Sequence, residues 1–152
     1  MIKISVCDDD EGQLTFFKQC FMEYNEKHKE KIEANFYQSV QSLLNEKKFS
    51  PDVYFLDIEL QDGNGLKLAG KIRTRNSKIP IVFITSHEEF MPEAFHVHAY
   101  QYLNEKKNAQ AVENVLNQLA DYFSEQNQIF SFQTYGEMIS LDCRDIICFT
   151  SD

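Results

Sequence analysis

Residues 51–65 read PDVYFLDIELQDGNG, the segment most informative about the fold. Four apolar residues in succession, Val53 to Leu56, end on Asp57, and a polar segment with two glycines follows. A strand that is apolar on both faces is typical of the centre of a parallel sheet, because helices cover both sides of such a sheet. Asp57 is therefore predicted at the carboxyl end of a central strand, where open α/β sheets hold their ligands. An aspartate there also suits a turn or a helix cap, so Asp57 alone does not establish a site.

The rest of the chain alternates between strand-like and helix-like segments. Strands are expected over residues 2–7, 31–37, 53–56, 81–86 and 100–103. One helix is expected to begin near residue 10, and others are expected at 40–44, over 66–75, around 88–96 and over 108–125. Short loops between such elements require parallel strands with right-handed crossovers. The predicted fold is α/β, a doubly wound five-stranded parallel sheet in the flavodoxin-like order 2-1-3-4-5 with helices on both faces.

Length and composition limit the class of protein. The 152 residues suffice for one domain with a single core and a little more. A net charge of -9 argues against a broad nucleic-acid-binding face, because phosphate contacts need clustered Lys and Arg. No apolar run approaches the roughly 20 residues that span a bilayer, and no signal peptide follows Met1. We therefore expect a cytoplasmic protein without membrane contact, and four cysteines that form no disulfide.

Three aspartates are expected to meet at one edge of the sheet. Asp8 and Asp9 follow the first strand, which neighbours the third strand in the predicted order, so their carboxylates converge with that of Asp57. Carboxylates at short range repel one another unless a cation lies between them, and an incomplete set of oxygen ligands with room for water suits Mg²⁺. The competing interpretation is that residues 8–10 only begin a helix, for which Asp10 is the predicted N-cap.

A metal-neutralised carboxylate can carry out covalent chemistry. Asp57 can then act as a nucleophile toward a phosphoryl donor and form an aspartyl phosphate. The hydroxyl of Thr85, at the end of the next strand, can donate a hydrogen bond to a phosphoryl oxygen. The alternative for Thr85 is a β-branched residue that simply finishes a strand.

In this order, the residues resemble the CheY-like receiver domain of two-component response regulators. The resemblance covers about residues 1–125 and rests on Asp8-Asp9, Asp57, Asn64-Gly65-Leu66, Thr85-Ser86 and Tyr102. It implies that Asp8 and Asp9 bind Mg²⁺ together with Asp57 and the backbone carbonyl of Glu59. It also implies that a sensor histidine kinase phosphorylates Asp57, that Thr85 and Tyr102 are switch residues, and that the domain forms a homodimer.

One position departs from the family pattern. The family has a Lys-Pro pair after the fifth strand, and its lysine reaches the phosphoryl oxygens, whereas this chain has Glu105 followed by Lys106. Lys106 is the candidate replacement, since a long flexible side chain can reach the phosphate. Without such a cation, the domain is instead a phosphorylation-independent interaction domain.

A further alternative is an aspartate-nucleophile phosphohydrolase. Such enzymes have an Asp-x-Asp pattern at the end of the first strand, whereas Asp57 ends the third strand and is followed by Ile58-Glu59. We therefore expect a signalling switch and not an enzyme.

The last part of the chain, residues 126–152, changes in character. Residues 129–135 alternate between apolar and polar side chains, and residues 138–141 and 145–149 predict further short strands. This C-terminal β segment is too short to bury a core of its own. Residues 130–152 resemble the first strands of a LytTR-type DNA-binding domain, which implies a transcriptional regulator. Residues 126–152 are accordingly expected to be a linker and the truncated start of that domain, so DNA binding belongs to the part that this chain lacks.

Overall fold

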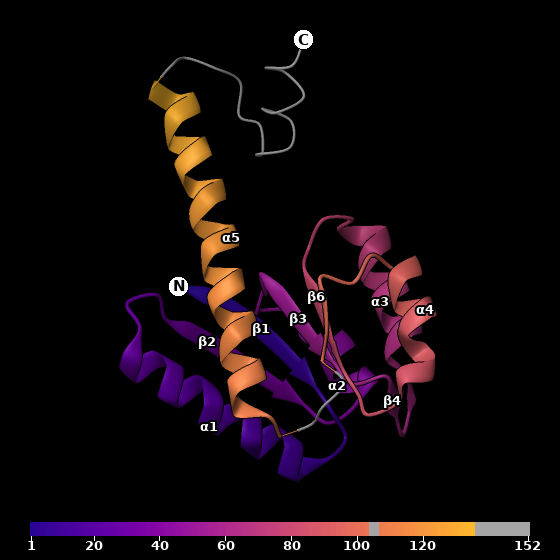
Figure 1. Cartoon of the computed structure of the whole chain (residues 1–152). Helices are drawn as coiled ribbons and strands as arrows, with labels where there is room; N and C mark the ends of the chain where they lie inside the picture. The colour runs from indigo at the N-terminus through magenta and orange to yellow at the C-terminus, as the bar shows by residue number, and fades with distance from the viewer. Residues whose placement is uncertain (104–106, 136–152) are drawn as a thin grey trace. The chain divides into compact units, whose positions relative to one another are not determined.

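The computed structural model describes residues 1–103 and 107–135, with side chains described up to residue 127. Its main sheet consists of β1 (Ile2–Cys7), β2 (Ile32–Tyr37), β3 (Val53–Leu56), β6 (Ile81–Ile84) and β7 (Gln101–Leu103). The strands pair in parallel in the order β2-β1-β3-β6-β7, which is the predicted 2-1-3-4-5 order (Figure 1). The predicted doubly wound α/β fold is therefore confirmed, and β1 and β3 are neighbours at its centre.

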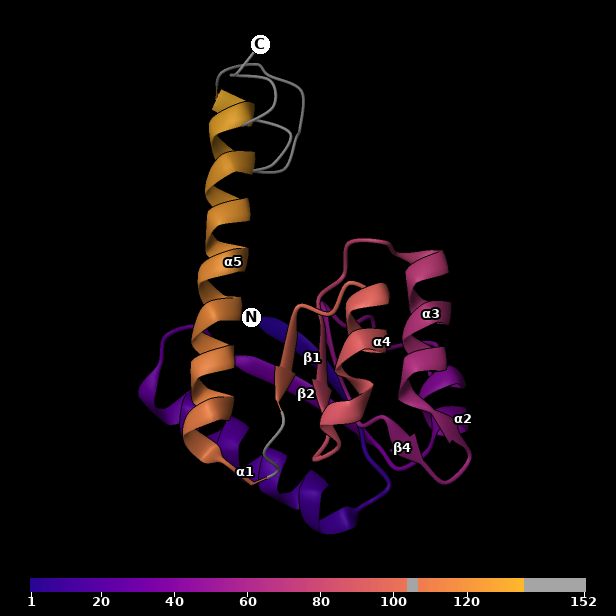
Figure 2. The same cartoon turned by 45° about the vertical axis from the view of Figure 1, so that its right-hand side comes forward.

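Helices connect these strands on both faces of the sheet. They are α1 (Glu11–Lys27), α2 (Val40–Leu44), α3 (Gly65–Arg75) and α4 (Met91–His96), and a 3-10 turn, η1 (Glu88–Phe90), precedes α4. The last helix, α5 (Ala109–Tyr135), follows β7. Helix α1 covers one face, and α2, α3 and α4 cover the opposite face (Figure 1, Figure 2). The start of α1 is the predicted one, because the Asp10 carboxylate accepts hydrogen bonds from the backbone N–H groups of Gly12 and Gln13.

The core lies on both sides of β3. Helix α1 buries the predicted apolar stripe, and its Phe17 and Phe21 rings meet Phe55 edge-on at centroid distances of 5.9 and 5.8 Å. On the opposite face, Leu56 belongs to the core cluster that includes Leu68 of α3. Burial on both faces explains why residues 53–56 form an unbroken apolar run.

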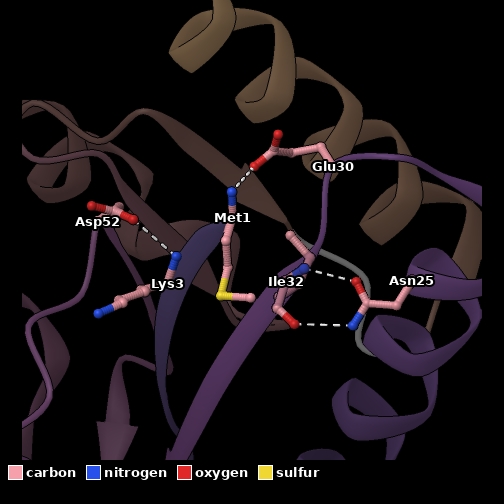
Figure 3. A network of polar contacts seen from close by, with 6 residues as sticks. All are labelled: Met1, Lys3, Asn25, Glu30, Ile32 and Asp52. Carbon is pink, nitrogen blue, oxygen red and sulfur yellow. Dashed lines mark hydrogen bonds and ion pairs between the residues drawn. The ribbon is translucent and has the colours of Figure 1, made fainter. Parts of the chain in front are cut away.

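Polar contacts fix the amino-terminal edge of the sheet. The Asn25 side chain accepts from the backbone N–H of Ile32 at 2.7 Å and donates to the Ile32 carbonyl at 2.9 Å, which joins the end of α1 to the start of β2 (Figure 3). The Lys3 N–H donates to the Asp52 carboxylate at 2.9 Å, and the Met1 amino group contacts Glu30 (Figure 3). These contacts set the starts of three neighbouring strands in register.

The structure differs from the sequence prediction after residue 125. Residues 129–135 were expected to form a strand, but α5 continues as a helix to Tyr135, so that prediction is wrong. Once a helix of five turns exists, each added residue gains a hydrogen bond without a new nucleation cost, and this outweighs a short alternating pattern. The strands expected at 138–141 and 145–149 lie outside the described residues.

Two further features concern the chain as a whole. It divides into two compact units, Met1–Glu113 and Asn114–Asp152. In the described part of the chain, no helix combines the length and the hydrophobicity that crossing a lipid bilayer requires.

Candidate functional site

The neighbouring ends of β1 and β3 hold the acidic residues. Asp57 follows β3, and its backbone N–H donates to the Cys7 carbonyl at 2.9 Å, while the Asp8 N–H donates to the Tyr37 carbonyl at 3.0 Å. Parallel pairing therefore brings both aspartates to the same edge. One carboxylate oxygen each from Asp8, Asp9 and Asp57 lies within 4.8 Å of the other two, so the structure brings the three predicted residues together.

Asp10, the fourth acid of this region, has a different task. Its carboxylate caps α1, and its backbone N–H donates to the Asp8 carboxylate at 2.9 Å. Capping thus accounts for Asp10. Asp8 and Asp57, by contrast, are only 2% and 3% exposed and lie close together at the ends of two adjacent strands. Burying a carboxylate is unfavourable unless a hydrogen bond or a cation compensates it, so a cluster of this kind is suited to a cation.

Negative charge at this edge also acts on the Cys7 thiol. Burial, and to a smaller extent the negative charges of Asp62, Asp8 and Asp57, raise its pKa to about 12. The acidic side chains of this edge therefore make the potential around the thiol more negative. That potential favours the binding of a cation above it.

An open hollow of about 400 Å³ lies in front of the acids. Its lining includes Asp9, Asp57, Glu59, Thr85 and His87. Thr85 follows β6 and is 1% exposed, so the predicted hydroxyl does lie at the same edge as Asp57. The set combines oxygen ligands with a hydroxyl donor, which is the chemistry that a hard divalent cation and a phosphoryl group require.

The second predicted switch residue, Tyr102, reaches this region through His87. The Tyr102 hydroxyl donates a hydrogen bond to the His87 carbonyl, and the His87 N–H donates to the Thr85 hydroxyl oxygen at 3.2 Å. Burial raises the pKa of Tyr102, and the negative charges of Glu89, Glu88 and Asp57 add to that effect. Tyr102 is therefore a hydrogen-bond donor that is linked to Thr85 through the backbone of His87.

Sequence reasoning missed His87. Its imidazole Nε2 lies 3.0 Å from a carboxylate oxygen of Glu59, and its Nδ1 lies 3.2 Å from one of Glu89. The signal available in the sequence was its position: polar residues in loops after parallel strands surround the ligand site of an open sheet. Glu59 itself lies in β4 (Glu59–Leu60), which pairs with β5 (Gly63–Asn64) in a small antiparallel hairpin.

Close backbone packing behind Asp57 explains the Asn64-Gly65 pair. The Gly65 N–H donates to the Ile58 carbonyl at 2.7 Å, and a Cβ atom on Gly65 would lie 2.1 Å from the Asp57 carbonyl oxygen. Only glycine permits this approach. Asn64 caps α3 by accepting from the Leu66 N–H at 2.7 Å. The pair therefore packs the start of α3 directly against the segment that carries Asp57.

The phosphate-contacting lysine predicted from sequence belongs to the segment after β7. Glu105 and Lys106 lie outside the described residues. Lys107 is described, and its ammonium nitrogen lies close to Gly12 at the start of α1, with the backbone in the left-handed region at φ 59°. It does not belong to the described lining of the hollow.

A doubly wound sheet with three carboxylates at the ends of its two central strands defines a flavodoxin-like α/β domain with an acidic binding edge. The sequence pattern of the response regulator receiver domain matches residues 4–117. The chain therefore belongs to the response regulator receiver family, and the expected resemblance is confirmed.

Curated relatives support the same family. The chain is 29% identical over 120 residues to an uncharacterized response regulatory protein of Yersinia pestis, which covers 79% of this chain and 49% of the relative. It is 32% identical over 111 residues to the sensory transduction protein LytR of Staphylococcus haemolyticus. That match covers 73% of this chain and 42% of LytR. The chain thus spans at most half the length of these relatives.

Solved structures show the same fold. The response regulatory domain of mrkE from Klebsiella pneumoniae has a TM-score of 0.69 at 23% identity, covering 82% of this chain and 100% of that one. TrrA from Thermotoga maritima, in complex with Mg²⁺ and a beryllium fluoride, has a TM-score of 0.67 at 22% identity. The match covers 78% of this chain and 99% of TrrA.

Proposed function

We propose that this chain is the phosphoacceptor switch of a two-component system, in which Asp57 receives a phosphoryl group from a sensor histidine kinase. The observation that carries the proposal is the convergence of the Asp8, Asp9 and Asp57 carboxylates within 4.8 Å at the carboxyl edge of the sheet. Three carboxylates with a hydroxyl donor at the same edge suit phosphoryl transfer, where positioning and charge neutralisation do most of the catalysis.

The residues present fit a bound Mg²⁺. Asp8, Asp9, Asp57 and the backbone carbonyl of Glu59 would hold it, because all supply the hard oxygen ligands that this ion prefers. When bound, the ion neutralises the acids and the charge of the incoming phosphoryl group. A carboxylate oxygen of Asp57 then attacks phosphorus. The bond from phosphorus to the histidine nitrogen of the donor breaks, and that nitrogen keeps the electron pair.

The hydrogen bonds around Thr85 supply a route from the phosphoryl group to the surface. The Thr85 hydroxyl oxygen accepts from the His87 N–H at 3.2 Å, and the His87 carbonyl accepts from Tyr102. When the Thr85 side chain rotates so that its hydroxyl donates to a phosphoryl oxygen, the hydroxyl oxygen moves away from the His87 N–H, which loses its acceptor. The segment of residues 85–87 then moves and carries the partner of Tyr102 with it. Phosphorylation thereby biases a two-state element.

The names of the relatives support a wider role. Proteins named LytR are described as sensory transduction and transcriptional regulatory proteins. We propose that the phosphorylated receiver regulates transcription through a LytTR-type DNA-binding domain that begins within residues 126–152, and that the receiver forms a homodimer. Lys106 is proposed as the cation that contacts the phosphoryl group.

Matched variants test the phosphoacceptor. The wild-type chain, incubated with acetyl phosphate and Mg²⁺, should gain the mass of one phosphoryl group, and Asp57→Asn should gain none. Asp9→Asn should lose most of the reaction, because it removes a metal ligand. Asp10→Asn is the control, since asparagine caps a helix as well as aspartate does and leaves the proposed ligands unchanged.

Other outcomes identify the rival functions. An unchanged mass for the wild-type chain, also with a cognate kinase, would favour a phosphorylation-independent interaction domain, the alternative that Glu105 motivates. Release of many equivalents of inorganic phosphate per chain would favour a phosphohydrolase.

A further inference from the structure

A second hollow lies at the amino-terminal edge of the sheet, opposite the edge that carries Asp57. Its volume is about 560 Å³, within the range of roughly 300–1,000 Å³ that is typical of small-molecule sites. The second half of α3, the end of α2 and the start of β3 form its walls. We refer to it as the α2–α3 hollow.

The floor of the α2–α3 hollow is apolar. Leu43 of α2, Ile72 of α3 and Ile79 before β6 contribute to it and are 7–8% exposed. Tyr54 adds a half-buried ring, and burial raises the pKa of its hydroxyl, so this group stays neutral. Such a floor accommodates an aliphatic or aromatic body.

The rim of the hollow is cationic. Lys71 and Arg75, one turn apart on α3, line it and are exposed. Neither forms an ion pair within the described part of the chain. Arg73, between them in sequence, differs: its guanidinium donates to the backbone carbonyls of Val97 and His98, both at 2.9 Å. Lys71 and Arg75 therefore have no such structural task.

The charge of α3 contrasts with that of the rest of the chain. The helix carries four basic residues and no acidic one, whereas the chain has a net charge of -9. Glu46 is an acidic residue of the lining, and hydrogen bonds from the backbone N–H groups of Lys48 and Phe49 lower its pKa. Its carboxylate is thus held by its own loop and stays ionised, so Lys71 and Arg75 leave the lining with one net positive charge.

We infer that the α2–α3 hollow binds a small anionic amphiphile, a molecule with a carboxylate, sulfonate or phosphate group on an apolar body. The apolar body packs on Leu43, Ile72 and Tyr54, and the anionic group lies between Lys71 and Arg75. A cationic ligand is disfavoured by charge repulsion at the rim. A neutral ligand of the same shape gains the apolar contacts but leaves both cations without a counter-charge. This inference does not depend on phosphorylation of Asp57.

A pair of fluorescent probes tests the inference on the full chain. 8-Anilinonaphthalene-1-sulfonate and neutral N-phenyl-1-naphthylamine share an aromatic body and differ in the anionic group. The sulfonate should bind, increase in fluorescence and shift the amide NMR signals of residues that line the hollow, and the neutral probe should bind at least about tenfold more weakly. No binding of the sulfonate, equal binding of both probes, or signal shifts confined to another surface would overturn the inference.

Variants on one helix supply the matched control. Lys71→Gln and Arg75→Gln should each weaken sulfonate binding about tenfold, as expected for the loss of one charge-assisted hydrogen bond. Lys67→Gln removes the same charge one turn before Lys71, at an exposed position outside the lining, and should leave affinity within about twofold. If Lys67→Gln and Lys71→Gln weaken sulfonate binding equally, the sulfonate is attracted by the overall charge of α3, and the proposed site is refuted. Asp57→Asn should bind the sulfonate normally, which separates this inference from the proposed phosphoacceptor function.

Discussion

Replacing Gly65 by alanine tests the packing that holds Asp57 in place. The added Cβ would lie 2.1 Å from the Asp57 carbonyl oxygen, 2.9 Å from its carbonyl carbon and 3.0 Å from the Ile58 Cα. All three are backbone atoms, so no side-chain rotation relieves the contact. Relief requires α3 to move away from the end of β3, which also weakens the hydrogen bond from Gly65 to the Ile58 carbonyl. Overpacking of this kind and the weakened hydrogen bond should together lower the free energy of unfolding by about 3 kcal/mol.

A second glycine on the same helix supplies the control. A Cβ on Gly70 of α3 would have no neighbour within 4 Å. Gly70→Ala should therefore stabilise the protein by about 0.5–1 kcal/mol, because alanine is the better helix former. Urea unfolding followed by far-UV circular dichroism measures both free energies, and the melting temperature of Gly65→Ala should fall by about 6–12 °C. A free energy of unfolding for Gly65→Ala within about 1 kcal/mol of wild type would show that the backbone contact at Gly65 is not close.

Three further predictions concern the helices that surround the site. Asn64→Ala should lower the free energy of unfolding by about 1 kcal/mol in urea titrations, because it removes the cap of α3, and Asn64→Asp should restore it. The Asp62 carboxylate accepts from two N–H groups at the start of α2, which lowers its pKa below 3.8. Asp62→Ala should therefore be less stable than wild type at pH 7. The difference should shrink as the pH falls below about 4 and vanish only below the lowered pKa of the folded state, where the carboxylate is protonated in both states. Arg73→Met removes the hydrogen-bond donors to the Val97 and His98 carbonyls, which follow α4. It should lower the free energy of unfolding by about 1–2 kcal/mol, and an unchanged melting temperature would contradict this.

The sheet and the acidic edge follow from sequence because their signals are local and strong. The run from Val53 to Leu56 is apolar on both faces, which only a central strand requires, and Asp57 comes immediately after it. The alternation of strands and helices then dictates parallel pairing, which brings Asp8 and Asp57 to the same edge.

Other features depend on tertiary context that one segment does not contain. Residues 129–135 have a strand pattern, yet they extend α5 because an existing helix propagates at little cost. The β4–β5 hairpin has two residues per strand, too few for any periodic signal. The contact of His87 with Glu59 joins residues 28 positions apart, and no local pattern encodes it.

A structure of the chain with Mg²⁺ and beryllofluoride, a mimic of the phosphoryl group, tests whether the three aspartates form a phosphoacceptor site. We expect an ion among the carboxylates of Asp8, Asp9 and Asp57 and the Glu59 carbonyl, with ligand oxygens about 2.0–2.1 Å away. We also expect the fluoride group on Asp57, with the Thr85 hydroxyl donating to it. An ion bound elsewhere, or beryllofluoride absent from Asp57 at saturating concentration, would contradict this expectation.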